Sequence, residues 1–337
     1  MRAPVRSLAI ASAIALSAAT LTSTPAQAAP VFTSTEVDGY AWAHDDSGSC
    51  TETEVATPDS DDVPVVENGP AVTYNGSASA TIQHDTVPAD TATVSTAATI
   101  TTKVTSVGTN LDTISMSLSG NGTIDTALAT SECDIHAGAG AYGEFDFTVT
   151  QAGWLTIESR SAGNTYTEFE IERTTGGYEQ NYAYELKHRS TKTVFLPAGT
   201  YSGDIETDID FEGTSDRTFT TQATIEASFA VAGSQSAAPT GKGAKYVTLG
   251  ARSCATNTLA AAITTKAKRV DKINKVTFLV NDKKVLSDGN PKKGEAYSLP
   301  VATDVDADVT AKVKLLKPKP GKPAKTVEVT SSHVACS

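Results

Sequence analysis

The stretch Asp204-Ile205-Glu206-Thr207-Asp208-Ile209-Asp210-Phe211-Glu212 places an acidic side chain at every second position. Successive side chains of a β-strand point to opposite faces of a sheet. A strand over 204–212 therefore carries five carboxylates on one face, those of Asp204, Glu206, Asp208, Asp210 and Glu212. Ile205, Ile209 and Phe211 share the other face. The pattern predicts a half-buried strand with an acidic outer surface.

The same period of two recurs on both sides of this stretch. Phe145, Phe147 and Val149 alternate with polar residues, and Phe169 and Ile171 lie between glutamates. From Ala71 to Val231, short runs rich in Thr, Val and Ile follow one another at intervals of about ten residues, which is typical of antiparallel sandwiches and barrels. We therefore predict an all-β fold, with a sandwich over residues 29–231.

Several local motifs predict how these strands are connected. Asn-Gly dipeptides favour tight hairpin turns, so Asn75-Gly76 and Asn121-Gly122 are expected to be turns. Ala137-Gly138-Ala139-Gly140 is expected to be a loop. The turn at Gln151-Ala152-Gly153 is expected to join its two flanking strands into a hairpin.

The segment Ala232–Lys245 consists of small and polar residues with Gly and Pro breakers. We interpret it as a flexible linker between a domain at 29–231 and a domain at 246–337. The charge changes sign across it: residues 29–231 carry 7 Lys and Arg against 31 Asp and Glu, whereas residues 232–337 carry 18 against 8. The two domains are expected to be strongly acidic and basic, respectively.

The four cysteines, Cys50, Cys133, Cys254 and Cys336, lie two on each side of this segment. Their spacing fits no metal-binding motif, and an even number of cysteines favours disulfides if the chain is exported. Of the three possible pairings, the linker favours Cys50–Cys133 and Cys254–Cys336.

The first residues suggest export. A short basic start precedes an apolar run over Leu8–Leu21, and small residues follow at Ala26 and Ala28. We interpret residues 1–28 as a cleaved signal peptide, the alternative being a membrane anchor. No other run approaches the ~20 apolar residues of a membrane-spanning helix. The mature protein is expected to be secreted.

Two parts of the chain resemble known families. Ile273–Val285, with Val276, Phe278 and Val280 alternating before Asn281-Asp282, resembles a hairpin of bacterial immunoglobulin-like domains, although Asp282 replaces the usual glycine. This resemblance implies a seven-stranded sandwich over 246–337 with a spacer or adhesive role. The segments 147–157 and 195–201 resemble the jelly-roll modules of secreted bacterial enzymes, such as pre-peptidase C-terminal domains, which implies an accessory module.

No catalytic motif is present, and we assign no catalytic residue, metal ligand or cofactor. The histidines are scattered, and His44 with Asp45 and Asp46 is interpreted as a polar loop. Asp59, Asp61 and Asp62 are candidate calcium ligands, but their spacing lacks the glycine and distal glutamate of an EF-hand, so a solvated loop is favoured. The five carboxylates of 204–212 are a second candidate site for calcium.

These features favour an exported, non-enzymatic protein that binds a surface, a carbohydrate or a cell-wall polymer. The alternatives are a hydrolase whose site lies in the N-terminal sandwich, which a deep pocket would support, and a calcium-dependent binding module. Lysines at 312, 314, 317, 319, 322 and 325 form a basic hairpin that is expected to contact anionic polymers or the acidic domain of its own chain. Nucleic acid is not an expected partner, because no aromatic residues intersperse these lysines.

Overall fold

The computed structural model describes residues 30–337, apart from 88, 127–132, 164, 176–180, 187, 214–215, 237 and 317–323. The predicted signal peptide and the lysines at 317, 319 and 322 lie outside the described residues.

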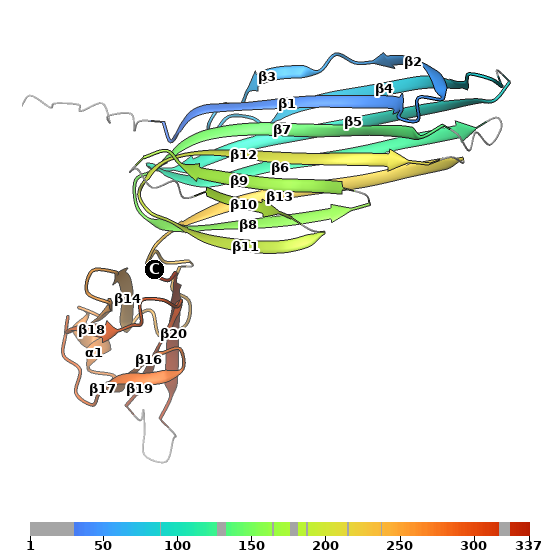
Figure 1. Ribbon diagram of the computed structural model, residues 1–337. Helices are drawn as coiled ribbons and strands as arrows, with labels where there is room; N and C mark the ends of the chain where they lie inside the picture. The colour runs from blue at the N-terminus through green and yellow to red at the C-terminus, as the bar shows by residue number, and fades with distance from the viewer. Residues whose placement is uncertain are drawn as a thin grey trace, which may run out of the picture.

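The N-terminal part consists of two antiparallel sheets stacked face to face (Figure 1). In sheet order, the first contains β10 (Asn181–Glu185), β9 (Thr165–Arg173), β12 (Gly199–Glu212), β7 (Ile135–Val149), β1 (Phe32–Asp45) and β3 (Ser60–Pro64). The second contains β11 (Arg189–Leu196), β8 (Gly153–Ala162), β13 (Arg217–Val231), β6 (Asn110–Thr126), β5 (Thr91–Val107), β4 (Val72–His84) and β2 (Cys50–Ala56).

The apolar positions of the alternating stretches form the core between these two sheets. Ile205 and Ile209 of β12 are fully buried, as are Phe145 of β7 and Phe169 of β9. Their acidic neighbours lie on the outer surface of the first sheet, with Asp204 and Glu206 only partly buried. The predicted all-β fold is confirmed, and the period-two pattern assigned both faces of β12 correctly.

The predicted hairpin at 151–153 is wrong. β7 pairs with β1 and β12 in the first sheet, whereas β8 pairs with β11 and β13 in the second. The short connection therefore crosses from one sheet to the other. Both strands have one buried face, so alternation alone could not tell a hairpin from a crossing between sheets.

The glycine motifs expected in turns or a loop lie inside strands. Asn75-Gly76 is part of β4, Asn121-Gly122 part of β6, and residues 137–140 part of β7. A Cβ on Gly76 would overlap the ring of Tyr74, and one on Gly122 would press on the carbonyl of Ser95. These glycines are required by close approach of neighbouring groups, which is the other common role of glycine within a strand.

The C-terminal part contains two smaller sheets around a separate buried cluster. In sheet order they comprise β14 (Val247–Ser253), β15 (Thr258–Ile263) and β18 (Ala296–Pro300), and β17 (Lys283–Asp288), β16 (Ile273–Val280), β19 (Ala307–Leu315) and β20 (Thr326–His333), with one short helix, α1 (Ala267–Val270). Val276, Phe278 and Val280 are buried, as predicted. Asn281 and Asp282 take positive φ values of 48° and 62°, so Asx residues supply this turn without glycine.

The segment 232–245, expected to be flexible, is hydrogen-bonded to the C-terminal part. The amide of Ser236 donates to Ser332 O at 2.9 Å, and Thr240 exchanges backbone hydrogen bonds with Thr330 of β20. On the other side, Ala232 N donates to Ala152 O, and the Trp154 indole donates to Ala335 O at 3.0 Å. The two parts thus meet at one end of the long sandwich (Figure 1). The composition of the segment could not predict these hydrogen bonds, because backbone groups make them.

The structure joins Cys50 to Cys133 and Cys254 to Cys336, the pairing that the sequence favoured. The first bridge joins Cys50, the first residue of β2, to Cys133, which lies shortly before β7. The second ties the end of β14 to the C-terminal residues. Each bridge lies within one half of the chain, and such bridges are compatible with an oxidising, extracellular environment.

Candidate functional site

The outer surface of the first sheet concentrates carboxylates from four neighbouring strands; we call it the acidic face. It comprises Glu36 and Asp38 of β1, Glu144 and Asp146 of β7, Glu168, Glu170 and Glu172 of β9, and Asp204, Glu206, Asp208, Asp210 and Glu212 of β12. The register sets Glu36, Glu144, Asp204 and Glu170 directly opposite one another in one row. Neighbouring strands lie only ~4.8 Å apart, so these like charges repel.

Tyrosine hydroxyls relieve part of this repulsion. Tyr40 donates a hydrogen bond to Asp208 Oδ1 at 2.7 Å, Tyr142 donates to Glu144 at 3.2 Å, and Tyr166 donates to Glu168. Burial and the neighbouring carboxylates raise the pKa of Tyr142 to about 12. Burial and the hydrogen bond to Asp208 also raise the pKa of Tyr40. The hydroxyls therefore remain protonated donors at neutral pH.

Two neighbouring aromatic side chains, Tyr40 and Trp42, occupy outward positions of β1 on this face, and we call them the aromatic platform. Tyr40 and Trp42 are stacked, with ring centroids 5.6 Å apart and an interplanar angle of 28°. Across the strand pair they face Gly140 and Gly138 of β7. A Cβ on Gly138 would overlap the Trp42 ring, and one on Gly140 would overlap the Tyr40 ring. The two glycines thus let both rings lie over the backbone of β7, each with part of its surface exposed.

Three carboxyl groups of β12 have raised pKa values. Burial, followed by repulsion from Glu170 and Glu168, raises the pKa of Asp204. Burial and the negative charge of Asp208 raise the pKa of Glu206. Burial also raises the pKa of Asp208, although the hydrogen bond from Tyr40 opposes the change. A bound cation or cationic group would relieve this repulsion.

These shifts predict that the N-terminal sandwich is more stable at mildly acidic pH. The folded protein protonates Asp204, Glu206 and Asp208 at higher pH than the unfolded chain does, so stability rises as pH falls toward their ordinary pKa values. At low ionic strength and with a chelator present, the midpoint of thermal unfolding should rise as the pH falls from about 7.5 toward the ordinary carboxyl pKa values of about 4.

Asp208→Asn tests the cause, because the amide removes the charge and keeps an acceptor for Tyr40. This variant should unfold at a higher temperature near pH 7.5 and depend less on pH. Glu226→Gln, on the outer surface of the second sheet, should leave the pH profile unchanged. A midpoint that falls on mild acidification would contradict the prediction.

The histidines are not all scattered in space. His44 of β1 lies directly opposite His136 of β7, with ring centroids 5.8 Å apart and an interplanar angle of 15°. Burial alone would lower the pKa of His136, but the contact with Asp210 and the charges of Asp134 and Asp46 raise it. The two histidines are far apart in the sequence, so their pairing could not be predicted. The sequence showed only that each occupies an outward position of an alternating strand.

The Asp59–Asp62 segment is not a simple loop, because Ser60–Pro64 forms β3 at the edge of the first sheet. The Asp62 amide donates to Asp38 Oδ1 at 2.5 Å. The side chain of Asp61 lies outside the described part of the structure. Among the described residues, the only three potential metal-ligand atoms within 4.8 Å of one another belong to Asp45, Cys50 and Cys133. The two sulfurs are bonded to each other, so they provide no thiolate ligand.

The outer surface of the second sheet has different chemistry. A shallow hollow of about 730 Å³ lies over β4, β5, β6 and β13. Its lining is made of small and uncharged polar residues, among them Asn75, Ser77, Thr99, Ser119, Asn121, Thr220 and Gln222. The lining contains no titratable or aromatic side chain. The hollow offers hydrogen-bonding groups without the charge or the aromatic rings of the acidic face.

Comparisons with known proteins do not identify a family. No protein-family profile matches the chain, and no curated protein matches it. Among solved structures, the adhesin domain of Epf from Streptococcus pyogenes overlaps 76% of this chain and 82% of its own, at 8% identity and a TM-score of 0.20. Hazelnut (Corylus avellana) vicilin overlaps 67% and 81% at 8% identity and a TM-score of 0.12. A multidomain part of extended synaptotagmin 2 overlaps 85% and 90% at 8% identity and a TM-score of 0.15.

Overlaps at such low scores carry no argument about function. The resemblances to immunoglobulin-like and pre-peptidase C-terminal domains therefore rest on the sequence motifs alone. In the described part of the chain, no helix has the length and apolarity needed to cross a membrane.

Proposed function

We propose that this is an exported, non-enzymatic binding protein that takes a carbohydrate or cell-wall polymer on the outer surface of its first sheet. The aromatic platform carries the proposal. Sugar rings present flat C–H faces that stack on aromatic rings, and their hydroxyls need hydrogen-bond partners at the rim. Tyr40 and Trp42 supply the rings, and Asp208 and Asp210 supply acceptors beside them.

The charge of the surface narrows the class of polymer. The acidic face carries no Lys or Arg at the outward positions of β1, β7, β9 and β12. Phosphate-bearing or uronic-acid polymers would be repelled, whereas neutral glycans would not. Amino sugars with free amines would gain attraction from the carboxylates. We therefore expect binding to neutral or cationic glycans, such as chitin and its deacetylated form.

The test is retention of the mature protein on insoluble chitin, deacetylated chitin, cellulose and a phosphate-bearing wall polymer, at low and moderate salt. Trp42→Ala should weaken binding to the retained glycan about 10–100-fold, since a central aromatic contact contributes ~1–3 kcal/mol. Gly140→Ala should weaken it as well, because a Cβ there meets only side-chain atoms, those of Asp208 and Tyr40, and displaces the Tyr40 ring. Circular dichroism checks that both variants fold.

Thr99→Ala in the hollow of the second sheet is the matched control and should bind as the unaltered protein does. Loss of binding in this variant alone would move the site to the second sheet. No retention on any glycan would refute the proposal. The hydrolase alternative predicts a different result, namely release of soluble sugar that is lost in Asp208→Asn.

A further inference from the structure

We propose that the end of the acidic face next to the Cys50–Cys133 bridge binds one divalent transition-metal ion of the Zn²⁺ class, through His44, His136, Asp46 and Asp134. The four ligands are not residues of the aromatic platform, and the only residue shared with the glycan-binding proposal is Asp210, which positions His136. It rests on how two imidazoles and two carboxylates from sequence-distant segments converge.

The contacts arrange these groups around a common space. His44 Nε2 lies 3.2 Å from Asp46 Oδ1, and His136 Nε2 lies 3.8 Å from Asp46 Oδ2. His136 Nε2 also lies 3.3 Å from Asp134 Oδ1. The Nε2 atoms of both histidines thus face the same carboxylate, and Asp134 completes a set of two nitrogens and two oxygens. Four such ligands suit a tetrahedral ion.

A second carboxylate sets the orientation of His136. Its Nδ1 lies 3.5 Å from Asp210 Oδ1 of β12. When Nδ1–H points to a carboxylate, Nε2 carries the free electron pair and becomes the metal ligand. Carboxylate–histidine–metal arrangements of this kind are common in zinc sites. Asp210 therefore acts as a positioning residue.

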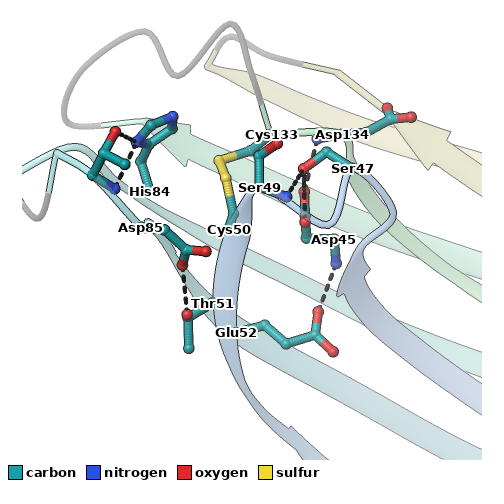
Figure 2. Close-up of a disulfide and its surroundings, with 11 residues drawn as sticks. Asp45, Ser47, Ser49, Cys50, Thr51, Glu52, His84, Asp85, Cys133 and Asp134 are labelled. Atoms are coloured by element: carbon teal, nitrogen blue, oxygen red, sulfur yellow. Dashed lines mark hydrogen bonds between the residues drawn. A yellow bond between two sulfur atoms is a disulfide. The ribbon is translucent and has the colours of Figure 1, made fainter.

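The backbone that carries the two aspartates is held in place. Asp46 N donates to Asp134 O at 2.9 Å, and Asp134 N donates to Asp45 Oδ1 at 2.8 Å. Figure 2 shows Asp134 beside Asp45 and directly after Cys133 of the disulfide. The bridge and these hydrogen bonds fix the ends of β1 and β7, so only side chains need to move on metal binding.

The side-chain movement needed for metal binding is small, and the ion can reach the site from solvent. The ligand atoms are more widely spread than around a bound ion, since no three of them lie within 4.8 Å of one another in the described structure. The side chains of Asp46 and Asp134 are 58% and 60% exposed, so their carboxylates can rotate inward. His44 is 33% exposed and His136 is 14% exposed, which leaves an open path for the ion.

The ligand types select the metal. Imidazole with carboxylate suits Zn²⁺, Ni²⁺ and Cu²⁺, whereas Ca²⁺ prefers six to eight oxygens. An ion here would also neutralise carboxylates at the end of the acidic face. Calcium is therefore expected to compete poorly.

The experiment is titration of the mature, tag-free protein with Zn²⁺ by calorimetry, with Co²⁺ absorption as a second readout. We expect one ion per chain and a Co²⁺ spectrum typical of tetrahedral coordination. His44→Ala and His136→Ala should each weaken binding about a hundredfold or more and abolish that spectrum. Asp210→Asn should weaken binding about 10–100-fold. His188→Ala, an exposed histidine elsewhere on the sandwich, is the matched control and should bind normally.

The two histidine variants test the proposal separately. His44 is the more exposed of the pair, so His44→Ala should fold even if His136→Ala does not. Absence of saturable Zn²⁺ uptake by the unaltered protein would overturn the proposal. Wild-type affinity in a folded His44→Ala or His136→Ala variant would do so too. Displacement of Zn²⁺ by an equal concentration of Ca²⁺ would mean that the carboxylates alone attract the ion, which also contradicts a histidine site.

Discussion

Replacing Cys254 and Cys336 together by serine should lower the free energy of unfolding of the C-terminal module by ~4–5 kcal/mol. The bridge closes a loop with a sequence separation of 82 residues, and its main effect is to restrict the unfolded chain. It also lies where the segment 232–245 begins, because a Cβ on Gly233 would press against the Cys254 sulfur. A loss of this size approaches the whole stability of a small module.

The other disulfide provides the matched control. Cys50–Cys133 closes a loop with a separation of 83 residues, so its removal should cost the N-terminal sandwich a similar amount. Both tryptophans, Trp42 and Trp154, lie in the N-terminal part. Because Trp154 donates to Ala335 O of the C-terminal part, the fluorescence of Trp42 in a Trp154→Phe background should follow the Cys50/Cys133 variant. Calorimetry should show a second transition moved only by the Cys254/Cys336 variant. A single transition moved equally by both pairs would show that the two parts unfold together.

Arg252→Met should destabilise the C-terminal module by about 3 kcal/mol. The Arg252 side chain is only 6% exposed. It donates to four backbone carbonyls, those of Ala302, Thr303, Val305 and Val334. One guanidinium thus joins β14, the loop before β19 and the C-terminal residues. Methionine fills the space but leaves these buried acceptors without their donor.

Arg252→Lys separates the charge from the shape of the group. Lysine keeps the positive charge but lacks the planar fork that reaches several carbonyls at once, so an intermediate loss of stability is expected. Guanidinium chloride unfolding of a protein that spans residues 29–337, followed by circular dichroism, measures both variants. Arg269→Met, which removes a single exposed hydrogen bond to Lys245 O, should change stability by less than about 0.5 kcal/mol. Equal losses of stability in Arg252→Met and Arg269→Met would contradict a stabilising role for the buried hydrogen bonds of Arg252.

Much of the fold was predictable because burial on one side of a strand imposes a period of two on the sequence. Ile205, Ile209 and Phe211 identified the inner side of β12, and its carboxylates identified the outer side. Connections were less predictable, because β7 and β8 show the same alternation whether they pair or lie in different sheets. Glycine was ambiguous for a similar reason, since Gly138 makes room for a ring rather than forming a turn.

The candidate sites depended on pairing between distant strands. Tyr40 and Trp42 become a platform only because β7 places Gly140 and Gly138 beneath them, although these glycines come much later in the chain. His44 meets His136 through the same register. No local pattern reports which strands are neighbours, so these combinations were absent from the sequence-based predictions.

By itself, the sequence determined the all-β fold, the pattern of exposed acid on β12, the division of charge and the favoured disulfide pairs. These properties follow from local alternation, composition and spacing, which act along the chain. Tertiary structure alone decided that β1, β7, β9 and β12 share one surface and that their aromatic, imidazole and carboxylate groups converge. It also decided that Ser236 and Thr240 are hydrogen-bonded to β20. These properties arise from hydrogen bonds between strands far apart in sequence, whose register brings their side chains together.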